Sequence, residues 1–311
     1  DGRCLKLLWH LRRIAIELKT PFKEVTVTQM EALIDGLEQG KVTKLTTKNA
    51  GGPYSSETIK DFKAIIRRFY KWLIGEDVAR LDELVGWFDM RCEPPELATF
   101  TLEEAQRMAR TQGPQGRALI MMLFDGGFRP TELFNVRLYD IHLDHDESGQ
   151  PVVMVRIRHS KTKPRTIALP LASDDVMFWI ERHPSGGGFN EQGRIEAKDP
   201  NALLIQWSYN YGRKVLHQLG NDELKERLYF YRFRHASATF YARHLTEFQM
   251  CARYGWVMGS KAIRRYVDAS GVLAQSATMA IRKIGVIQNG TCKPRSSNGG
   301  THTAEAFLKH T

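Results

Sequence analysis

The sequence predicts a mainly α-helical protein of two domains, the second of which carries a small β-hairpin. Its 311 residues, 42% of them hydrophobic and 26% charged, are enough for two globular cores. Two consecutive prolines within Arg91–Glu96 resist helix and separate two stretches of helical periodicity. The apolar residues of Val152–Arg158 are typical of a strand. We therefore expect a helical domain over residues 1–90, a linker over 91–100, a mixed α/β domain over 101–285 and a flexible tail over 286–311.

Three helices are expected in the first domain. Residues 3–18 carry leucine and isoleucine at helical spacing, and Thr28–Glu31 has the capping-box pattern that starts a second helix. The polar, glycine-bearing stretch Gly40–Ser55 is typical of a loop. Ser56 is the expected N-cap of a third helix, whose apolar residues recur every three or four positions.

The second domain is expected to begin with helices and to continue with the hairpin. A capping box at Thr101–Glu104 starts one helix, and the apolar run Ala118–Phe124 predicts a buried helix that two glycines end. Val152–Arg158 and Thr166–Leu169 are the expected strands, joined by a turn at Ser160–Pro164. A helix over 173–180, a glycine-rich loop over 185–193 and mostly helical residues over 203–284 complete the domain.

The charge distribution indicates a polyanionic partner. The chain has 45 basic and 35 acidic side chains, a formal net charge of +10 and a pI near 9.4. Residues 1–100 hold 16 of the basic and 15 of the acidic side chains, so nearly all of the excess lies in the rest of the chain. Such a concentration of positive charge suits a nucleic acid, although many basic proteins bind none.

The sequence argues against a membrane protein, a zinc protein and a secreted protein. Its longest apolar run is far shorter than the roughly 18 to 20 residues of a membrane-spanning helix. The four cysteines lie far apart and form no CxxC or Cys/His cluster. The start of the chain has no apolar block followed by a cleavage site. We expect a reducing compartment, the cytoplasm.

One edge of the third helix is basic. Lys60, Lys63, Arg67 and Lys71 follow each other at three- and four-residue steps, which places them along one side of a helix. These four side chains are candidates for contact with the phosphates of a nucleic acid. The same spacing is also typical of an ordinary solvent-exposed helix face.

Four segments of the second domain carry residues suited to phosphate chemistry. They are Gly127–Leu133, the hairpin turn, Tyr231–His235, and Gly255-Trp256 followed by Tyr266. In the first segment Arg129 stands at a chain corner, where its guanidinium can point into a cleft or can pair with a neighbouring glutamate as a helix cap.

The hairpin and the third segment have ordinary alternatives as well. The hairpin has no acidic residue between 151 and 170, and its cations are Arg156, Arg158, Lys161, Lys163 and Arg165. Together these cations would create a positive electrostatic potential that attracts the phosphates of a nucleic acid. Surface hairpins, however, are often basic by chance. Arg234 could form a structural ion pair, and His235 could be a hydrogen-bonded, partly buried imidazole.

The order and spacing of the four segments resemble the tyrosine recombinase, or phage integrase, family over residues 97–285. The family's first arginine stands in a G-x-R-x-x-E-L setting, which Arg129 and Glu132 match. Its hairpin lysine is matched by Lys161, with Lys163 as second choice.

The later motifs carry the same resemblance. The family's H-x-x-R-H motif is matched at Arg234 and His235, and its G-H or G-W pair by Gly255-Trp256. Its nucleophilic tyrosine is matched by Tyr266. The Gly-Trp-x-x-Gly-Ser form, followed by Arg-Tyr-Val-Asp, is most similar to archaeal members, including those of mobile elements and viruses.

The sequence departs from the family's pattern in two respects. Tyr231 stands where the family has His or Lys, and the interval between Trp256 and Tyr266 is one residue longer than usual. A phenol is a poor proton acceptor at neutral pH, so either Tyr231 hydrogen-bonds a phosphate oxygen or water takes the proton. The general base stays open.

The resemblance implies a helical, SAM-like core-binding domain and a catalytic domain that form a C-shaped clamp around duplex DNA. It implies a site-specific recombinase of a mobile element, an integrase that acts as a homotetramer on paired DNA sites, without a metal or another cofactor. Its place would be the nucleoid of the host cell, which carries the element or a virus. A type IB topoisomerase and an inactive DNA-binding regulator are the alternatives.

The resemblance also implies the role of each site residue. Arg129 and Arg234 would stabilise the charged phosphate, Lys161 would protonate the departing 5′-oxygen, and Trp256 would contact the phosphate. Tyr266 would attack and form a 3′-phosphotyrosyl ester. The supporting residues would be Glu132, Tyr231 and His235, and the DNA-binding residues Lys60, Lys63, Arg67, Lys71, Arg158, Lys163 and Arg165. Tyr229, Tyr241 and Tyr254 are the competing nucleophiles.

Overall fold

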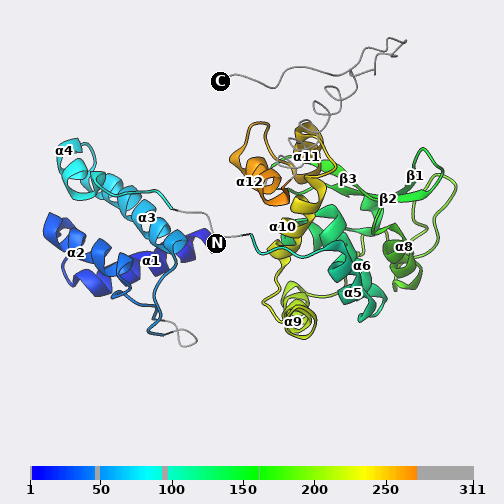
Figure 1. Ribbon diagram of the computed structural model, residues 1–311, viewed down its shortest axis with the longest axis horizontal. Helices are drawn as coiled ribbons and strands as arrows, with labels where there is room; N and C mark the ends of the chain where they lie inside the picture. Colours follow the sequence, from blue (N-terminus) through cyan, green and yellow to red (C-terminus); the bar gives the residue numbers. More distant parts are fainter. Residues whose placement is uncertain (1, 46–49, 93–96, 161, 272–311) are drawn as a thin grey trace, which may run out of the picture. The chain divides into compact units, whose positions relative to one another are not determined.

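The computed structural model describes residues 2–45, 50–92, 97–160 and 162–271. The chain divides into two compact units, Asp1–Glu96 and Leu97–Thr311 (Figure 1). The division falls within the stretch expected to be a linker, and each unit has a hydrophobic core of its own. The clamp arrangement stays a prediction. The expected tail over 286–311 and the side chain of Lys161 lie outside the described residues.

Every regular element among the described residues of the first unit is a helix. Its elements are α1 (Gly2–Leu18), the 3₁₀ helix η1 (Phe22–Glu24), α2 (Val27–Glu38), α3 (Ser56–Ile74), α4 (Val78–Leu81) and the π-helical turn η2 (Asp82–Gly86). The apolar sides of α1, α2 and α3 pack together through Ile14, Ile34 and Ile66, each at most 2% exposed. The expected helical character of this part of the chain is confirmed.

Two helix starts differ from those expected. α2 is capped by Thr26, whose hydroxyl accepts a hydrogen bond from the backbone N–H of Gln29, so the expected capping box at Thr28–Glu31 is wrong by two residues. α3 is capped by Ser55 rather than Ser56. Neighbouring hydroxyl residues suit the same cap, and the local pattern does not choose between them.

The second unit combines helices with a three-stranded antiparallel sheet in the order β1-β2-β3. Its elements are α5 (Leu102–Arg110), α6 (Pro114–Gly126), α7 (Pro130–Leu133), η3 (Leu138–Asp140), β1 (Ile141–His145), β2 (Pro151–Ile157), β3 (Arg165–Leu169), α8 (Ser173–Arg182), α9 (Tyr209–Leu219), η4 (Gly220–Leu224), α10 (Phe230–Tyr241), α11 (Glu247–Tyr254) and α12 (Lys261–Ser270). None of the described helices is long and apolar enough to cross a bilayer.

The expected hairpin is confirmed as β2 and β3, and the sequence missed the strand β1. β1 pairs with β2 from Ile141 opposite Val155 to His145 opposite Pro151. Ile141 is the buried residue of β1, and the others are half-buried or exposed. The strand therefore carries too little apolar alternation to be recognised without its partner.

Helix α6 forms the centre of the second unit. Every residue of Ala118–Phe124 is at most 1% exposed, because α5, α8 and α10 pack around it (Figure 1). The helix is followed by Gly127, which has a left-handed φ of 55°. A Cβ atom at this position would lie 2.3 Å from the Tyr254 ring, so glycine is required for both the backbone conformation and the close approach.

Candidate active site

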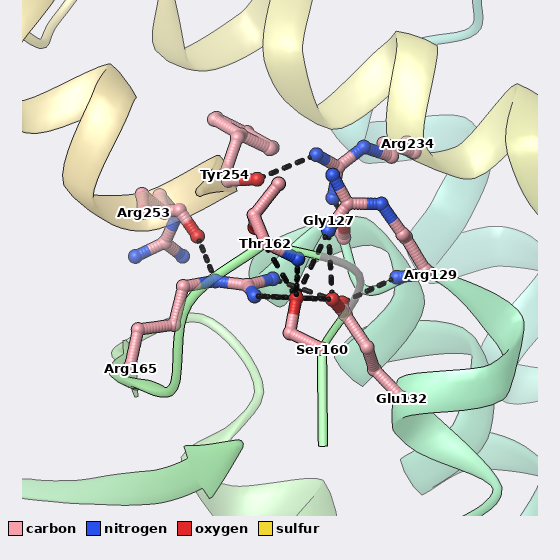
Figure 2. Close-up of polar contacts among 9 residues, drawn as sticks. All are labelled: Gly127, Arg129, Glu132, Ser160, Thr162, Arg165, Arg234, Arg253 and Tyr254. Carbon is pink, nitrogen blue, oxygen red and sulfur yellow. Dashed lines mark hydrogen bonds and ion pairs between the residues drawn. The ribbon is translucent and has the colours of Figure 1, made fainter. Parts of the chain in front are cut away.

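Arg234 lies in the second turn of α10 and is 4% exposed. Its guanidinium donates hydrogen bonds to the carbonyl oxygens of Gly127 at 2.6 Å and Tyr254 at 2.7 Å (Figure 2). Burial and the nearby charge of Arg129 lower the pKa of Arg234 to about 10, so it stays protonated at neutral pH. These contacts fix a cation between the end of α6 and the end of α11.

The carboxylate of Glu132 joins Arg129 to the hairpin. It accepts hydrogen bonds from the Arg129 backbone N–H at 2.9 Å and from Arg129 Nη1 at 2.8 Å. Ser160 Oγ donates to it at 2.8 Å, and Arg165 donates through Nη1 at 3.0 Å and Nη2 at 2.9 Å (Figure 2). Glu132 is 2% exposed, and the expected pairing of Arg129 with this glutamate is present.

The electrostatics of Glu132 follow from these contacts. Burial alone would raise the pKa of its carboxyl group, because the charged form loses its hydration. Hydrogen bonds from Arg165, the Arg129 backbone and Ser160, together with the charge of Arg165, lower the pKa to about 2. Glu132 is therefore ionised at neutral pH and partly neutralises the two arginines beside it.

Tyr266 lies on α12 and is 6% exposed. Its hydroxyl is 2.8 Å from Nδ1 of His235, and its ring stacks on Trp256 with centroids 5.2 Å apart and planes 6° apart. The guanidinium carbon of Arg234 lies 5.5 Å from the centroid of the same Trp256 ring. Tyr266 and Arg234 thus meet the same indole, that of Trp256, and His235 meets the Tyr266 hydroxyl.

No protein-family model and no curated protein matches this sequence. Solved structures do match. A lambda integrase tetramer bound to a Holliday junction aligns with a TM-score of 0.59 at 12% identity, over 85% of this chain and 71% of that one. A lambda integrase (75–356) dimer bound to a COC′ core site aligns with a TM-score of 0.58 at 13% identity, over 86% and 88%. The second unit has the fold of a tyrosine recombinase catalytic domain.

Within the recombinase fold, the competing tyrosines have other surroundings. The Tyr241 hydroxyl donates to Asp125 at 2.6 Å, and the Tyr254 hydroxyl lies 2.7 Å from that of Ser237. Burial raises the pKa of Tyr254 to about 12. Tyr229 is 37% exposed at the start of α10. Among the contacts of the described residues, Tyr266 is the one of the four tyrosines whose hydroxyl lies within hydrogen-bonding distance of an imidazole.

The basic residues of the hairpin have different environments. Arg165 has a side chain only 7% exposed, and its Nε also donates to the carbonyl oxygen of Arg253 at 2.9 Å. Arg165 was expected on a DNA-facing surface, but its side chain is buried against Glu132 and the Arg253 backbone. Arg158 is exposed and pairs with Asp140, and Lys163 is exposed.

Two of the four cations on α3 are held within the first unit. Lys63 is 5% exposed and donates to Glu38 at 2.5 Å and to the Asp89 carbonyl oxygen at 2.8 Å. Arg67 donates to three backbone carbonyl groups at the end of the unit, those of residues 85, 86 and 88. Lys60 and Lys71 are exposed. The basic edge of α3 is therefore partly structural.

Sequence reasoning missed Ser160 and the position of Arg165. A signal for Arg165 was present, because it shares the period-two alternation of Ile167 and Leu169, which are buried on the inner face of β3. Sequence reasoning also missed Arg253, which donates to the Asp125 carboxylate at 2.6 Å. Nothing in the local sequence pairs two residues so far apart along the chain.

Proposed function

We propose that this chain is a site-specific DNA recombinase of the integrase type, which cuts and rejoins DNA strands through a 3′-phosphotyrosyl intermediate on Tyr266. The observation that carries the proposal is the shared indole of Trp256, on which the Tyr266 ring stacks and near which the Arg234 guanidinium lies. The fold supports DNA as the substrate, since the similar integrases are described as complexes with DNA.

The two arginines suit the charge that develops in the reaction. Attack on a phosphodiester places negative charge on the non-bridging oxygens, which fixed guanidinium groups stabilise. A guanidinium has five N–H groups, and the two carbonyl contacts of Arg234 occupy only two of them. Arg129 is positioned in the same way by Glu132. We propose that these arginines supply the positive charge without a metal ion.

The proposed step forms one bond and breaks one. The Tyr266 oxygen attacks phosphorus and loses its proton, the P–O5′ bond breaks, and the 5′-oxygen leaves with a proton from a general acid. We propose Lys161 as this acid, with Lys163 as the second candidate. The residues on either side of Lys161 support the choice, because their hydrogen bonds tie the hairpin turn to Glu132. Ser160 Oγ donates to the Glu132 carboxylate, and the Thr162 backbone N–H donates to Ser160 Oγ. Rejoining reverses the step.

We propose that the enzyme acts as a homotetramer on paired DNA sites of a mobile element, in the cytoplasm of its host. The exposed cations Lys60, Lys71, Arg158 and Lys163 are the proposed phosphate contacts. Lys63, Arg67 and Arg165 donate hydrogen bonds to groups of the protein itself, and we propose that they stabilise its structure rather than contact the phosphates. Trp256 is proposed to contact the phosphate through its indole N–H.

A nicked suicide substrate tests the proposal. A pool of randomised duplexes, each with a nick close to one phosphate, loses a short fragment on cleavage and traps the protein on DNA. The wild-type chain is expected to form an adduct that survives SDS and to do so in EDTA. Tyr266→Phe is expected to bind the same duplexes without forming the adduct, and Tyr229→Phe is the matched control that retains it. An adduct in Tyr266→Phe, or an absolute need for Mg²⁺, would contradict the mechanism.

One observation favours a second candidate. Tyr231, in place of the family's usual His or Lys, suits a DNA-binding regulator that has lost the chemistry. Such a protein would bind duplex DNA and form no adduct in the suicide assay. A topoisomerase would instead relax a supercoiled plasmid without exchanging strands between two sites.

A further inference from the structure

We propose that His235 is the general base that takes the proton from the Tyr266 hydroxyl when the phenol attacks the phosphate. This proposal rests on the proposed function and assigns the role that Tyr231 leaves open. The contact that carries it joins two helices, α10 and α12, and no motif in either helix specifies it.

The geometry places the imidazole at the reacting oxygen. His235 Nδ1 lies 2.8 Å from Tyr266 Oη, within the range for proton transfer through a hydrogen bond. It is the hydrogen bond that the phenol makes within the described part of the chain. The two rings are tilted by 32°, and Trp256 covers the tyrosine ring with its planes almost parallel. The phenol is thus held on one side by stacking and at its oxygen by the imidazole.

The protonation states favour transfer in this direction. Burial raises the pKa of Tyr266, opposed by the charges of Arg234 and Arg265, so the phenol needs an acceptor before it can attack. Burial and the charges of Arg265 and Arg234 lower the pKa of His235, so its imidazole is neutral at neutral pH. A neutral imidazole with its proton on Nε2 presents the lone pair of Nδ1 to the hydroxyl.

The helix geometry explains why His235 can replace Tyr231. The two residues are four positions apart on α10, so they lie one turn apart on the same side of the helix. Tyr231 is 50% exposed and makes no hydrogen bond with the residues that the structure describes. The base has therefore moved one turn along the helix face, toward the buried tyrosine.

The proton balance of the step is complete. The proton of Tyr266 Oη passes to His235 Nδ1, the Oη–P bond forms, and the P–O5′ bond breaks as the general acid gives its proton to the leaving oxygen. The imidazolium then stands near Arg234 and Arg265, where the negative charge on the phosphate oxygens offsets the added positive charge. In rejoining, His235 returns the proton to the departing phenolate.

The first test reads the hydrogen bond without DNA. In protein labelled with ¹⁵N-histidine, long-range ¹H–¹⁵N spectra are expected to show His235 as the neutral Nε2–H tautomer at neutral pH. The Nδ1 resonance is expected to shift in Tyr266→Phe. A proton on Nδ1 in the wild-type chain would overturn the proposal, because His235 would then be a donor to the phenol.

The second test measures the rate of adduct formation on a duplex recovered from the randomised pool by the wild-type chain. His235→Asn keeps an acceptor near the place of Nδ1 but cannot take a proton, and it is expected to lose roughly 10²–10⁴-fold in rate. His244→Asn, the same change in an exposed histidine just after α10, is the matched control and is expected to stay within a few-fold of wild type. His235→Ala is expected to regain rate when imidazole is added.

A changed leaving group separates a base from an acid. A bridging 5′-phosphorothiolate leaves as a thiolate and needs no proton. It is therefore expected to restore the cleavage rate of Lys161→Ala but not that of His235→Asn. The wild-type cleavage rate is expected to rise with pH as His235 loses its proton. The rate of His235→Asn is expected not to show this rise.

The outcomes separate the two proposals. A wild-type adduct together with a His235→Asn rate within a few-fold of wild type overturns the role of His235 and leaves the recombinase proposal standing. Restoration of His235→Asn by the thiolate also overturns it, since His235 would then be the acid. A wild-type chain that traps no DNA overturns the recombinase proposal, and with it the catalytic role of His235.

Discussion

Replacing Glu132 by glutamine tests the network that positions Arg129 and the hairpin. The change keeps the shape of the side chain but removes the charge that Arg129 and Arg165 share. It also turns one acceptor into an amide N–H₂ group that faces donors. Because Glu132 is 2% exposed, water cannot take over these contacts.

The expected magnitude follows from the pKa of Glu132, which the folded chain lowers from 4.5 to about 2. A difference of this size corresponds to about 3 kcal/mol of stability at neutral pH. The contribution is complete above pH 4.5, because the carboxylate is then ionised in both states, and it is lost as the pH falls from 4.5 toward 2. The free energy of unfolding of Glu132→Gln is thus expected to be about 3 kcal/mol lower than that of wild type at neutral pH. This difference is expected to become smaller as the pH falls below 4.5.

Urea denaturation of the full chain over a series of pH values measures both effects. Glu38→Gln, a change in the first unit, serves to assign the unfolding transitions. The transition whose midpoint it leaves unchanged belongs to the second unit. Glu181→Gln is the matched control, because Glu181 is 64% exposed in its ion pair with Arg182 and is expected to cost less than about 1 kcal/mol. A Glu132→Gln curve that runs parallel to wild type at all pH values, or lies within about 1 kcal/mol of it at neutral pH, would refute the reasoning.

Two further predictions concern the core and the proposed DNA contacts. Asp125→Ala leaves the nearly buried Arg253 side chain without its carboxylate partner. It is expected to lower the free energy of unfolding, measured by urea denaturation, by about 3–5 kcal/mol. A loss below about 1 kcal/mol would show that the ion pair contributes little to stability. Lys60→Gln and Lys71→Gln are each expected to reduce the slope of log K against log salt for duplex binding by about 0.9. Unchanged slopes would remove these two lysines from the interface.

The sequence was sufficient where function depends on residues that are neighbours along the chain. The interval between Arg129 and Glu132 spans one helical turn, which already brings the two side chains together. The hairpin followed from two strands joined by a short turn. In both cases the interaction is local, so spacing alone determines it.

The sequence was insufficient where a residue's partner lies elsewhere. Lys63 was recognised as part of a basic helix edge, but periodicity does not reveal that Glu38 and the Asp89 carbonyl group lie opposite. Arg165 was assigned to a DNA-facing surface for the same reason. The bond between His235 and Tyr266 joins residues on two helices, and only the packing of those helices brings their atoms together.

The residues that follow α6 explain how the chain holds several arginines close together. Gly127 binds Arg234 through its carbonyl oxygen, and Glu132 binds Arg129 and Arg165 through its carboxylate. Three guanidiniums and one carboxylate leave an excess of two positive charges, and like-charge repulsion helps to lower the pKa of Arg234. The attack of a deprotonated phenol on a phosphodiester would place two negative charges on the phosphate oxygens. In the proposed reaction, the excess of two positive charges would match this transition state better than the singly charged substrate, which is the condition for catalysis by differential binding.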